Sequence, residues 1–181
     1  EIGRSKIGVV GGEPFGSQAY VVMDGVGTEP SRIVPDEMEL KWLRVNASAT
    51  FALTRACVPA MKAKGWGRVI NMTSLTLNGQ WDGFVPYVAS KGAMLGLTKG
   101  LARELGQHGI TVNAIAPGAV VSEAEDRVFG DRLSDYNSFI LKNQSVKTRI
   151  LAEDVANLAV FLASDAARMI SGQNIGIDGG W

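Results

Sequence analysis

The sequence has little of what would support a metal centre, a disulfide framework or a membrane anchor. Its 181 residues include one cysteine, Cys57, and one histidine, His108. A single cysteine cannot form a disulfide within the chain, and no apolar run approaches the roughly 18 residues of a membrane span. The first residues also lack the layout of a signal peptide. We therefore expect no metal site, no membrane association and a cytoplasmic location.

The chain also lacks an excess of charge of either sign. Lys plus Arg and Asp plus Glu number 18 each, and the sequence pI is about 6.9. This balance offers nothing to recruit nucleic acid or an anionic membrane. A content of 46% hydrophobic and 20% charged residues is typical of a globular α/β protein of one domain. The composition favours a small-molecule substrate as the partner.

The side chains that could take part in a reaction lie in residues 68–91, RVINMTSLTLNGQWDGFVPYVASK. Residues 69–72 predict a buried strand, and Ser74 follows its carboxyl end, the edge at which open parallel sheets place their ligands. Tyr87 and Lys91 are spaced i and i+4, so on a helix they lie on one face. A nearby cation favours the phenolate and lowers a tyrosine pKa from about 10, which suits proton exchange with a carbonyl oxygen. Alone, such a spacing is also typical of a solvated helix face.

Four motifs extend this pattern along the chain: INMTS at 70–74, YVASK at 87–91, ITVNAIAPGAV at 110–120 and SGQNIGIDGG at 171–180. In order and spacing they resemble the short-chain dehydrogenase/reductase family, over about residues 38–181. The amino-acid sequences of these motifs are most similar to those of bacterial secondary-alcohol dehydrogenases and ketone reductases. The resemblance implies a three-layer α/β, Rossmann-like fold with a doubly wound, mostly parallel sheet. It also implies an oxidoreductase that moves a hydride between NAD or NADP and a secondary alcohol or ketone.

The resemblance assigns catalytic roles to four residues. Tyr87 would be the acid/base, and Ser74 would orient the substrate oxygen. Lys91 would lower the pKa of Tyr87 and bind the nicotinamide ribose. Asn46 would kink its helix and hold a water that links Lys91 to solvent, although a polar residue that opens a second helix is the alternative.

The cofactor site is implied in two places. After the predicted strand 110–116, Pro117, Gly118 and Val120 would lie along the nicotinamide, and Ser122 stands where the family has a Thr that binds the diphosphate or carboxamide. Near the start, residues 6–18 predict a short strand and a glycine-rich turn. In that turn Gly12 and Gly16 take the place of the phosphate-binding loop. An ordinary strand-ending turn fits those glycines equally well.

The N-terminal half is shorter than the family pattern requires. Met-Asp-Gly at 23–25 replaces the family's Asn-Asn-Ala-Gly motif, and only 34 positions separate Gly12 from Asn46. Since one βαβ unit needs about 30 residues, at least one unit is absent, and no residue can be assigned to distinguish NAD from NADP. We expect one domain, with a reduced nucleotide-binding part at 1–30 and a catalytic part at 31–181. Three alternatives remain: a lyase or isomerase that uses Tyr87, an inactive binding or partner subunit, and a piece of a longer protein.

The remaining patterns concern the substrate and the assembly. Residues 75–85 are apolar for a connection, and Leu75, Leu77, Trp81 and Phe84 predict a substrate wall that suits bulky or aryl ketones. Trp81 or Phe84 packing on the core or on a neighbouring subunit is the alternative. Residues 123–147 are polar with sparse apolar points, which predicts a mobile lid.

Two long helices are predicted, at 36–64 and at 87–107. Each carries apolar or small residues on more than one face, so a homo-oligomer, dimer or tetramer, is expected. The first helix has a 3.6-period stripe that we expect to be buried, formed by Met38, Trp42, Val45, Ala49, Ala52 and Ala56.

Overall fold

The computed structural model describes the backbone of residues 7–8, 20–23, 41–79 and 84–181, and the side chains of the last two ranges. Within these residues one sheet runs in the order β1-β2-β3-β4-β5. Its strands β2 to β5 are parallel, and β1 is antiparallel to β2. The strands are β1 (Ile7–Gly8), β2 (Tyr20–Met23), β3 (Gly67–Met72), β4 (Ile110–Pro117) and β5 (Asn174–Ile177).

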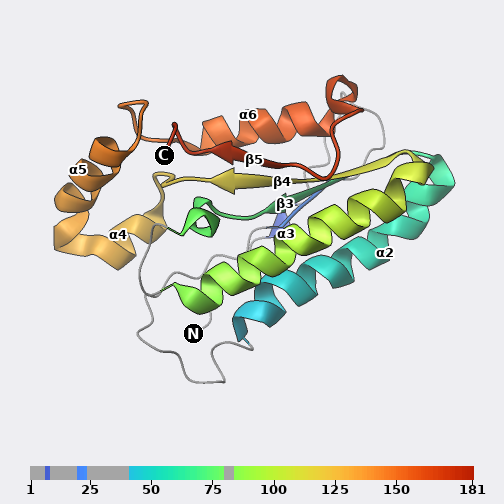
Figure 1. The fold of residues 1–181 in the computed structure, drawn as a ribbon, viewed down its shortest axis with the longest axis horizontal. Helices are drawn as coiled ribbons and strands as arrows, with labels where there is room; N and C mark the ends of the chain where they lie inside the picture. Colours follow the sequence, from blue (N-terminus) through green and yellow to red (C-terminus); the bar gives the residue numbers. More distant parts are fainter. Residues whose placement is uncertain (1–6, 9–19, 24–40, 80–83) are drawn as a thin grey trace.

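Helices cover both faces of this sheet (Figure 1). The helices α2 (Ala49–Lys64) and α3 (Val85–Leu105) lie side by side on one face, and α6 (Ala152–Ala163) lies on the other. Two shorter helices, α4 (Glu123–Phe129) and α5 (Leu133–Asn143), lie beyond the carboxyl ends of β4 and β5. This three-layer, mostly parallel arrangement confirms the predicted fold class.

The central strands are buried because both faces of the sheet are covered. Alternate side chains of a strand point to opposite faces, and β3 divides accordingly: Ile70 and Met72 pack with Leu162 of α6. Val69 instead packs with Met61 of α2. A strand buried on both faces tends to be apolar along its length, and in β3 the buried Arg68 and Asn71 interrupt this pattern.

The helix that leads into α2 differs from its predicted form. It is described from residue 41 and contains a π-helical turn at Arg44–Ser48 before α2 begins. Two residues of the predicted stripe, Ala52 and Ala56, are exposed, whereas Thr50 and Thr54 are buried. Polar side chains face the protein interior because they hydrogen-bond there, as Thr50 does by donating to the carbonyl of Asn46.

The segment predicted as a lid forms α4, a 3-10 turn at Gly130–Arg132 and α5. Its two ends are held together, because Val120 and Ile150 form an isolated parallel bridge and the Val121 amide donates to the Ile150 carbonyl at 2.9 Å. The chain end is tied to the same region, since the Val146 amide donates to the Gly179 carbonyl at 2.8 Å. The lid is therefore a helical excursion that leaves and returns at one place.

The N-terminal strand, predicted to be short, is described at Ile7–Gly8 and runs antiparallel to β2. A parallel strand would have placed the turn that follows it at the carboxyl edge of the sheet, beside Ser74. Because β1 is antiparallel to β2, its own carboxyl end lies at the other edge. The glycine-rich turn, Met38 and Trp81 all lie outside the described residues.

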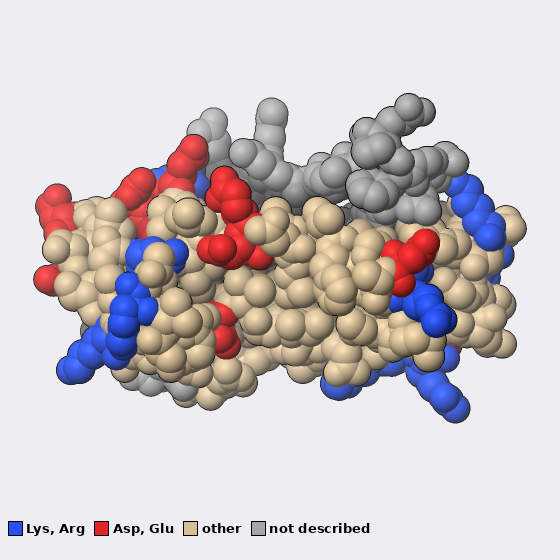
Figure 2. Space-filling view, turned by 90° about the horizontal axis from the view of Figure 1, so that it is seen from above, with Lys and Arg blue, Asp and Glu red and all other residues tan. Residues whose placement is uncertain are grey.

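The described surface carries charges of both signs. In Figure 2, most Asp and Glu lie in the left half of the face shown and reach close to its middle, Lys and Arg lie toward both ends, and an uncharged area lies between them. Within the described part of the chain, no helix has the length and apolarity needed to cross a membrane.

Candidate active site

Ser74 lies directly after β3, where its side chain is nearly buried. Its Oγ accepts hydrogen bonds from the Thr76 amide at 3.2 Å and from the Thr76 hydroxyl at 2.9 Å. A serine hydroxyl accepts two hydrogen bonds and donates one, so these contacts leave the Ser74 proton to be donated elsewhere. Thr76 thus orients Ser74, a role that sequence reasoning missed although the Ser-x-Thr spacing is a local signal for it.

Tyr87 and Lys91 lie one turn apart near the start of α3, as their spacing predicts. The Lys91 side chain is buried, and its Nζ donates to the Met72 carbonyl at 2.7 Å and lies 5.5 Å from the centre of the Tyr87 ring. Trp42 and Phe84 hold the same ring edge-on, with centroids 5.4 Å and 6.2 Å away. The phenol is therefore fixed between two aromatic rings and a buried ammonium group.

Asn46 lies in the π-helical turn and is fully buried. Its Nδ2 donates to Ser90 Oγ at 2.8 Å, and Ser90 Oγ donates to the Tyr87 carbonyl at 2.7 Å. The Oδ1 atom of Asn46 has no hydrogen-bond partner among the described residues. π-Helical turns are frequent at functional sites, and this one places Asn46 against the turn of α3 that carries Tyr87 and Lys91.

A cavity of about 210 Å³ joins the catalytic candidates to the loop that follows β4. Ser74, Thr76 and Tyr87 line one side of it. The other lining residues come from the loop after β3, the loop after β4 and the lid helices: Leu75, Phe84, Gly118, Ala119, Val120, Ser122, Ala124, Glu125, Val128, Phe129 and Tyr136. The structure thus brings two of the four catalytic candidates to one cavity, with Lys91 directly behind the Tyr87 ring.

Gly118 stands at a point of close packing. A Cβ atom there would lie 2.9 Å from the Asp178 Cα and 2.9 Å from the Ile150 Cδ1. Only glycine therefore lets the loop after β4 pass between these two neighbours. Packing accounts for this glycine, and its contact with a cofactor stays a prediction.

The side of the cavity formed by the lid contains residues that the sequence did not single out. Phe129 and Tyr136 stack with ring centroids 3.7 Å apart. Burial raises the pKa of Tyr136 well above its usual value, and the neighbouring Glu125 carboxylate raises it further, so the phenol stays protonated. Glu125 itself forms an ion pair with Arg149 at 2.6 Å. No periodic pattern in the sequence indicates that residues this far apart in the chain lie together.

Other candidates fall into three groups. Leu75 and Phe84 line the cavity, whereas Leu77 is not part of its lining, and the substrate wall stays a prediction. Pro117 ends β4. Gly12, Gly16 and Trp81 lie outside the described residues. Among the residues that the structure describes, no cluster of His, Cys, Asp or Glu could hold a metal ion.

Comparison with known proteins identifies the family. The family described as enoyl-(acyl carrier protein) reductase matches residues 26–181. The D-beta-hydroxybutyrate dehydrogenase of Rhizobium meliloti (strain 1021) is 35% identical over 180 residues, which cover 90% of this chain and 67% of that protein. A 3-oxoacyl-(acyl-carrier-protein) reductase of Rickettsia felis is 37% identical over 80% of this chain and 58% of its own length.

Solved structures agree with these relatives. A 4-hydroxyisoleucine dehydrogenase complexed with NADH superposes with a TM-score of 0.79 at 33% identity, covering 90% of this chain and 68% of that one. A 7α-hydroxysteroid dehydrogenase complexed with NADH and a 7-oxo bile acid gives a TM-score of 0.83 at 28% identity, with 89% and 62% coverage. The chain belongs to the short-chain dehydrogenase/reductase family. It spans between 55% and 67% of the length of the first curated relatives.

Proposed function

We propose that the protein is a nicotinamide-dependent oxidoreductase that interconverts a secondary alcohol and a ketone. The observation that carries the proposal is the buried Lys91 ammonium, 5.5 Å from the centre of the Tyr87 ring, at the carboxyl edge of a parallel sheet. The names of the relatives, which are dehydrogenases and reductases, support the same chemistry.

The residues present fit the nicotinamide end of such a cofactor. A buried ammonium donor behind the tyrosine suits the paired hydroxyls of a ribose, and the loop with Gly118, Val120 and Ser122 borders the same cavity. In this proposal Lys91 binds the ribose and the loop after β4 lies along the ring. The phosphate-binding end would involve Gly12 and Gly16, outside the described residues. Bound NAD or NADP would supply the hydride.

The chain's own residues hold the substrate oxygen and move its proton. In the proposed mechanism the Ser74 hydroxyl, oriented by Thr76, donates a hydrogen bond to the carbonyl oxygen. Tyr87 gives its proton to that oxygen during reduction and takes it back during oxidation. Lys91 favours the phenolate of Tyr87, and Asn46, with its unpartnered Oδ1, would hold a water that relays the proton to solvent.

The test of the proposed function begins with cofactor binding. We expect NADH or NADPH to gain fluorescence on binding and to raise the melting temperature of the protein. We then expect turnover of uncharged ketones, with aryl ketones such as acetophenone preferred over sugars and short hydroxy acids because Leu75 and Phe84 make the cavity apolar. If neither nucleotide binds, the non-redox alternative that uses Tyr87 for proton transfer replaces this proposal.

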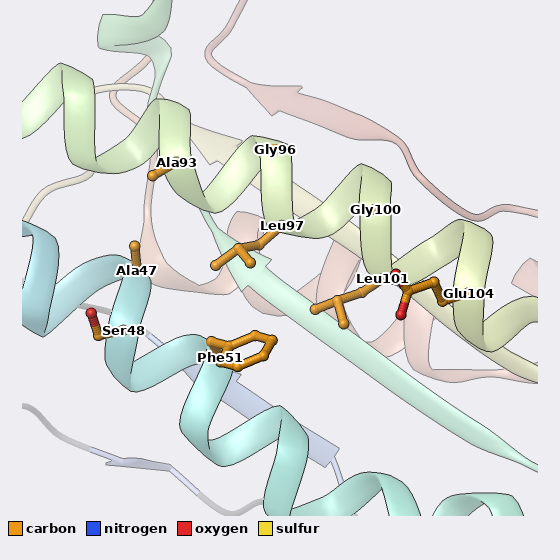
Figure 3. A pocket seen from close by; sticks show the side chains of 9 residues that line it. All are labelled: Ala47, Ser48, Phe51, Ala93, Gly96, Leu97, Gly100, Leu101 and Glu104. Atoms are coloured by element: carbon orange, nitrogen blue, oxygen red, sulfur yellow. The ribbon is translucent and has the colours of Figure 1, made fainter.

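We also infer that two copies of the chain associate through α2 and α3. A groove of about 610 Å³ runs between these helices, and Figure 3 shows Phe51, Leu97 and Leu101 along it. Phe51 is 45% exposed in the single chain. On the α3 side, Gly96 and Gly100 have open space where a Cβ would be, so a second helix could approach closely. A second copy that presents the same face would cover this apolar surface.

A further inference from the structure

Several hydrogen bonds on the lid side of the cavity meet at one side chain, Arg149, which lies just before α6. Its Nη2 donates to both carboxylate oxygens of Glu125 at 2.6 Å and 2.8 Å, and to the Ala119 carbonyl at 3.2 Å. Its Nη1 donates to the Asn137 side chain. Its guanidinium carbon lies 5.6 Å from the centre of the Tyr136 ring. One guanidinium group therefore contacts the loop after β4, helix α4 and helix α5.

These contacts matter because the lid helices are short. Helix α4 has 7 residues and α5 has 11, and isolated helices below about 12–15 residues are marginal in water. Their position must therefore come from contacts with the rest of the protein. The Arg149 and Glu125 side chains are only 15% and 10% exposed, so water and salt screen this ion pair far less than an exposed one.

The cluster also borders the reacting groups. Ala119, Glu125 and Tyr136 line the same cavity as Ser74 and Tyr87, whereas Arg149 is not part of the lining. Arg149 can thus affect a substrate only through the residues that it holds. A planar guanidinium that binds several oxygens at once fixes their relative positions, whereas a lysine ammonium acts as a point charge.

We propose that Arg149 is a positioning residue of the substrate cavity, which fixes α4 and α5 over Tyr87 by joining Glu125, Asn137 and the Ala119 carbonyl. This inference rests on the proposed function for its kinetic consequence only. Loss of Arg149 moves the lid wall and weakens ketone binding, while proton transfer by Tyr87 and cofactor binding at Lys91 continue.

The kinetic test compares Arg149→Gln with Arg149→Lys and with Arg127→Gln, which removes the same charge from an exposed position on α4. With acetophenone and NADH or NADPH, Arg149→Gln should raise KM about tenfold, within the range of coupled neighbours, with kcat within about threefold of the parent. The KM of Arg149→Lys should lie between those of Arg149→Gln and the parent, and the KM of Arg127→Gln should match that of the parent. The double variant Glu125→Gln/Arg149→Gln should raise KM no further than Arg149→Gln alone. A fall in kcat at unchanged KM would overturn the proposal.

A second readout does not depend on turnover. Hydrogen–deuterium exchange followed by mass spectrometry should show faster amide exchange in Arg149→Gln over residues 119–143, by at least about tenfold. Amides of α2 and α3 should exchange as in the parent. Equal acceleration in all helices, or none in 119–143, would make the ion pair an ordinary packing feature and refute the positioning role. If the parent turns over no ketone, the proposed function fails and this exchange pattern alone decides the role of Arg149.

Discussion

The two faces of α3 differ in how they use polar and apolar side chains. The buried residues of this helix include three polar ones, Ser90, Lys91 and Thr98, beside Pro86, Met94 and Leu105. The outward face carries Ala93, Gly96, Leu97 and Gly100 along the groove with α2 (Figure 3). Surface helices of globular proteins usually bury their apolar stripe. In α3 the inward, buried face also carries hydrogen-bonded polar side chains, and the groove side carries the small and apolar residues that we propose contact a second copy.

The inward face can carry polar side chains because they form hydrogen bonds with buried partners. Asn71 Nδ2 donates to Thr98 Oγ1 at 2.8 Å, and Thr98 Oγ1 donates to the Met94 carbonyl at 2.8 Å. Lys91 and Ser90 bond to carbonyl oxygens in the same way. Buried polar groups that are satisfied in this manner fix one arrangement of neighbouring elements. Substitutions on the two faces should therefore fail in different ways.

The largest effect is expected at the catalytic end of the inward face. Tyr87→Phe removes the hydroxyl that would transfer the proton in the proposed mechanism but keeps the ring between Trp42 and Phe84. Turnover of ketone should fall by at least about 10²-fold, with the circular dichroism spectrum and melting temperature unchanged. Steady-state assays measure the loss, and a variant within tenfold of the parent would contradict the acid/base role.

On the outward face, Gly100→Leu should separate the copies without unfolding the chain. The position has open space in the single chain, whereas overpacking costs about 1–3 kcal/mol per copy, and the substitution occurs twice across a two-fold interface. Light scattering should give a multiple of the 19.2 kDa chain mass for the parent and a lower multiple for the variant. Ser134→Leu, which adds a similar group on α5, is the control. A parent of 19.2 kDa at micromolar concentration would rule out the association.

Deeper on the inward face, Thr98→Val should lower the free energy of unfolding by about 1–3 kcal/mol. The change keeps the shape of the side chain but leaves the buried Asn71 amide without its acceptor. Chemical denaturation measures the difference, and Thr98→Ser, which keeps the hydroxyl, should recover most of it. If Thr98→Val and Thr98→Ser lowered the free energy of unfolding equally, the effect would come from packing and not from the hydrogen bond.

The smallest effect is expected from Gly96→Ala. In the Gly100→Leu background alanine should raise the free energy of unfolding by about 0.5–1 kcal/mol, because it favours the helix and meets no neighbouring atom. In the parent assembly the gain should be smaller, since the added methyl group would lie in the interface. The same gain in both backgrounds would place Gly96 outside the contact between copies.

The sequence predicted those parts of the molecule that depend on local pattern. The apolar segments predicted β3 and β4, the predicted end of the first long helix at residue 64 matches the end of α2 at Lys64, and the spacing of Tyr87 and Lys91 placed them on one helix face. The fold class and the family are confirmed. The catalytic and cofactor roles of individual residues stay predictions.

The parts that could not be predicted depend on partners distant in the sequence. Apolar periodicity assumes that apolar side chains face inward, so it selected Ala52 and Ala56 instead of Thr50 and Thr54. The buried place of Asn46 depends on Ser90, 44 positions away. Likewise, Glu125 and Arg149 are 24 positions apart, and nothing local in the sequence links them.

The two ends of the lid segment lie next to each other, and this has a consequence for how the protein can evolve. Because Val121 and Ile150 are hydrogen-bonded neighbours, the segment between them leaves and rejoins the fold at a single point. Insertions and replacements are best tolerated where the ends of an excursion are already close together. Glu125, Tyr136 and Arg149 all lie within that excursion, whereas Ser74, Tyr87 and Lys91 lie outside it. Replacement of this stretch by the corresponding stretch of a relative is therefore expected to leave the fold around Ser74, Tyr87 and Lys91 intact.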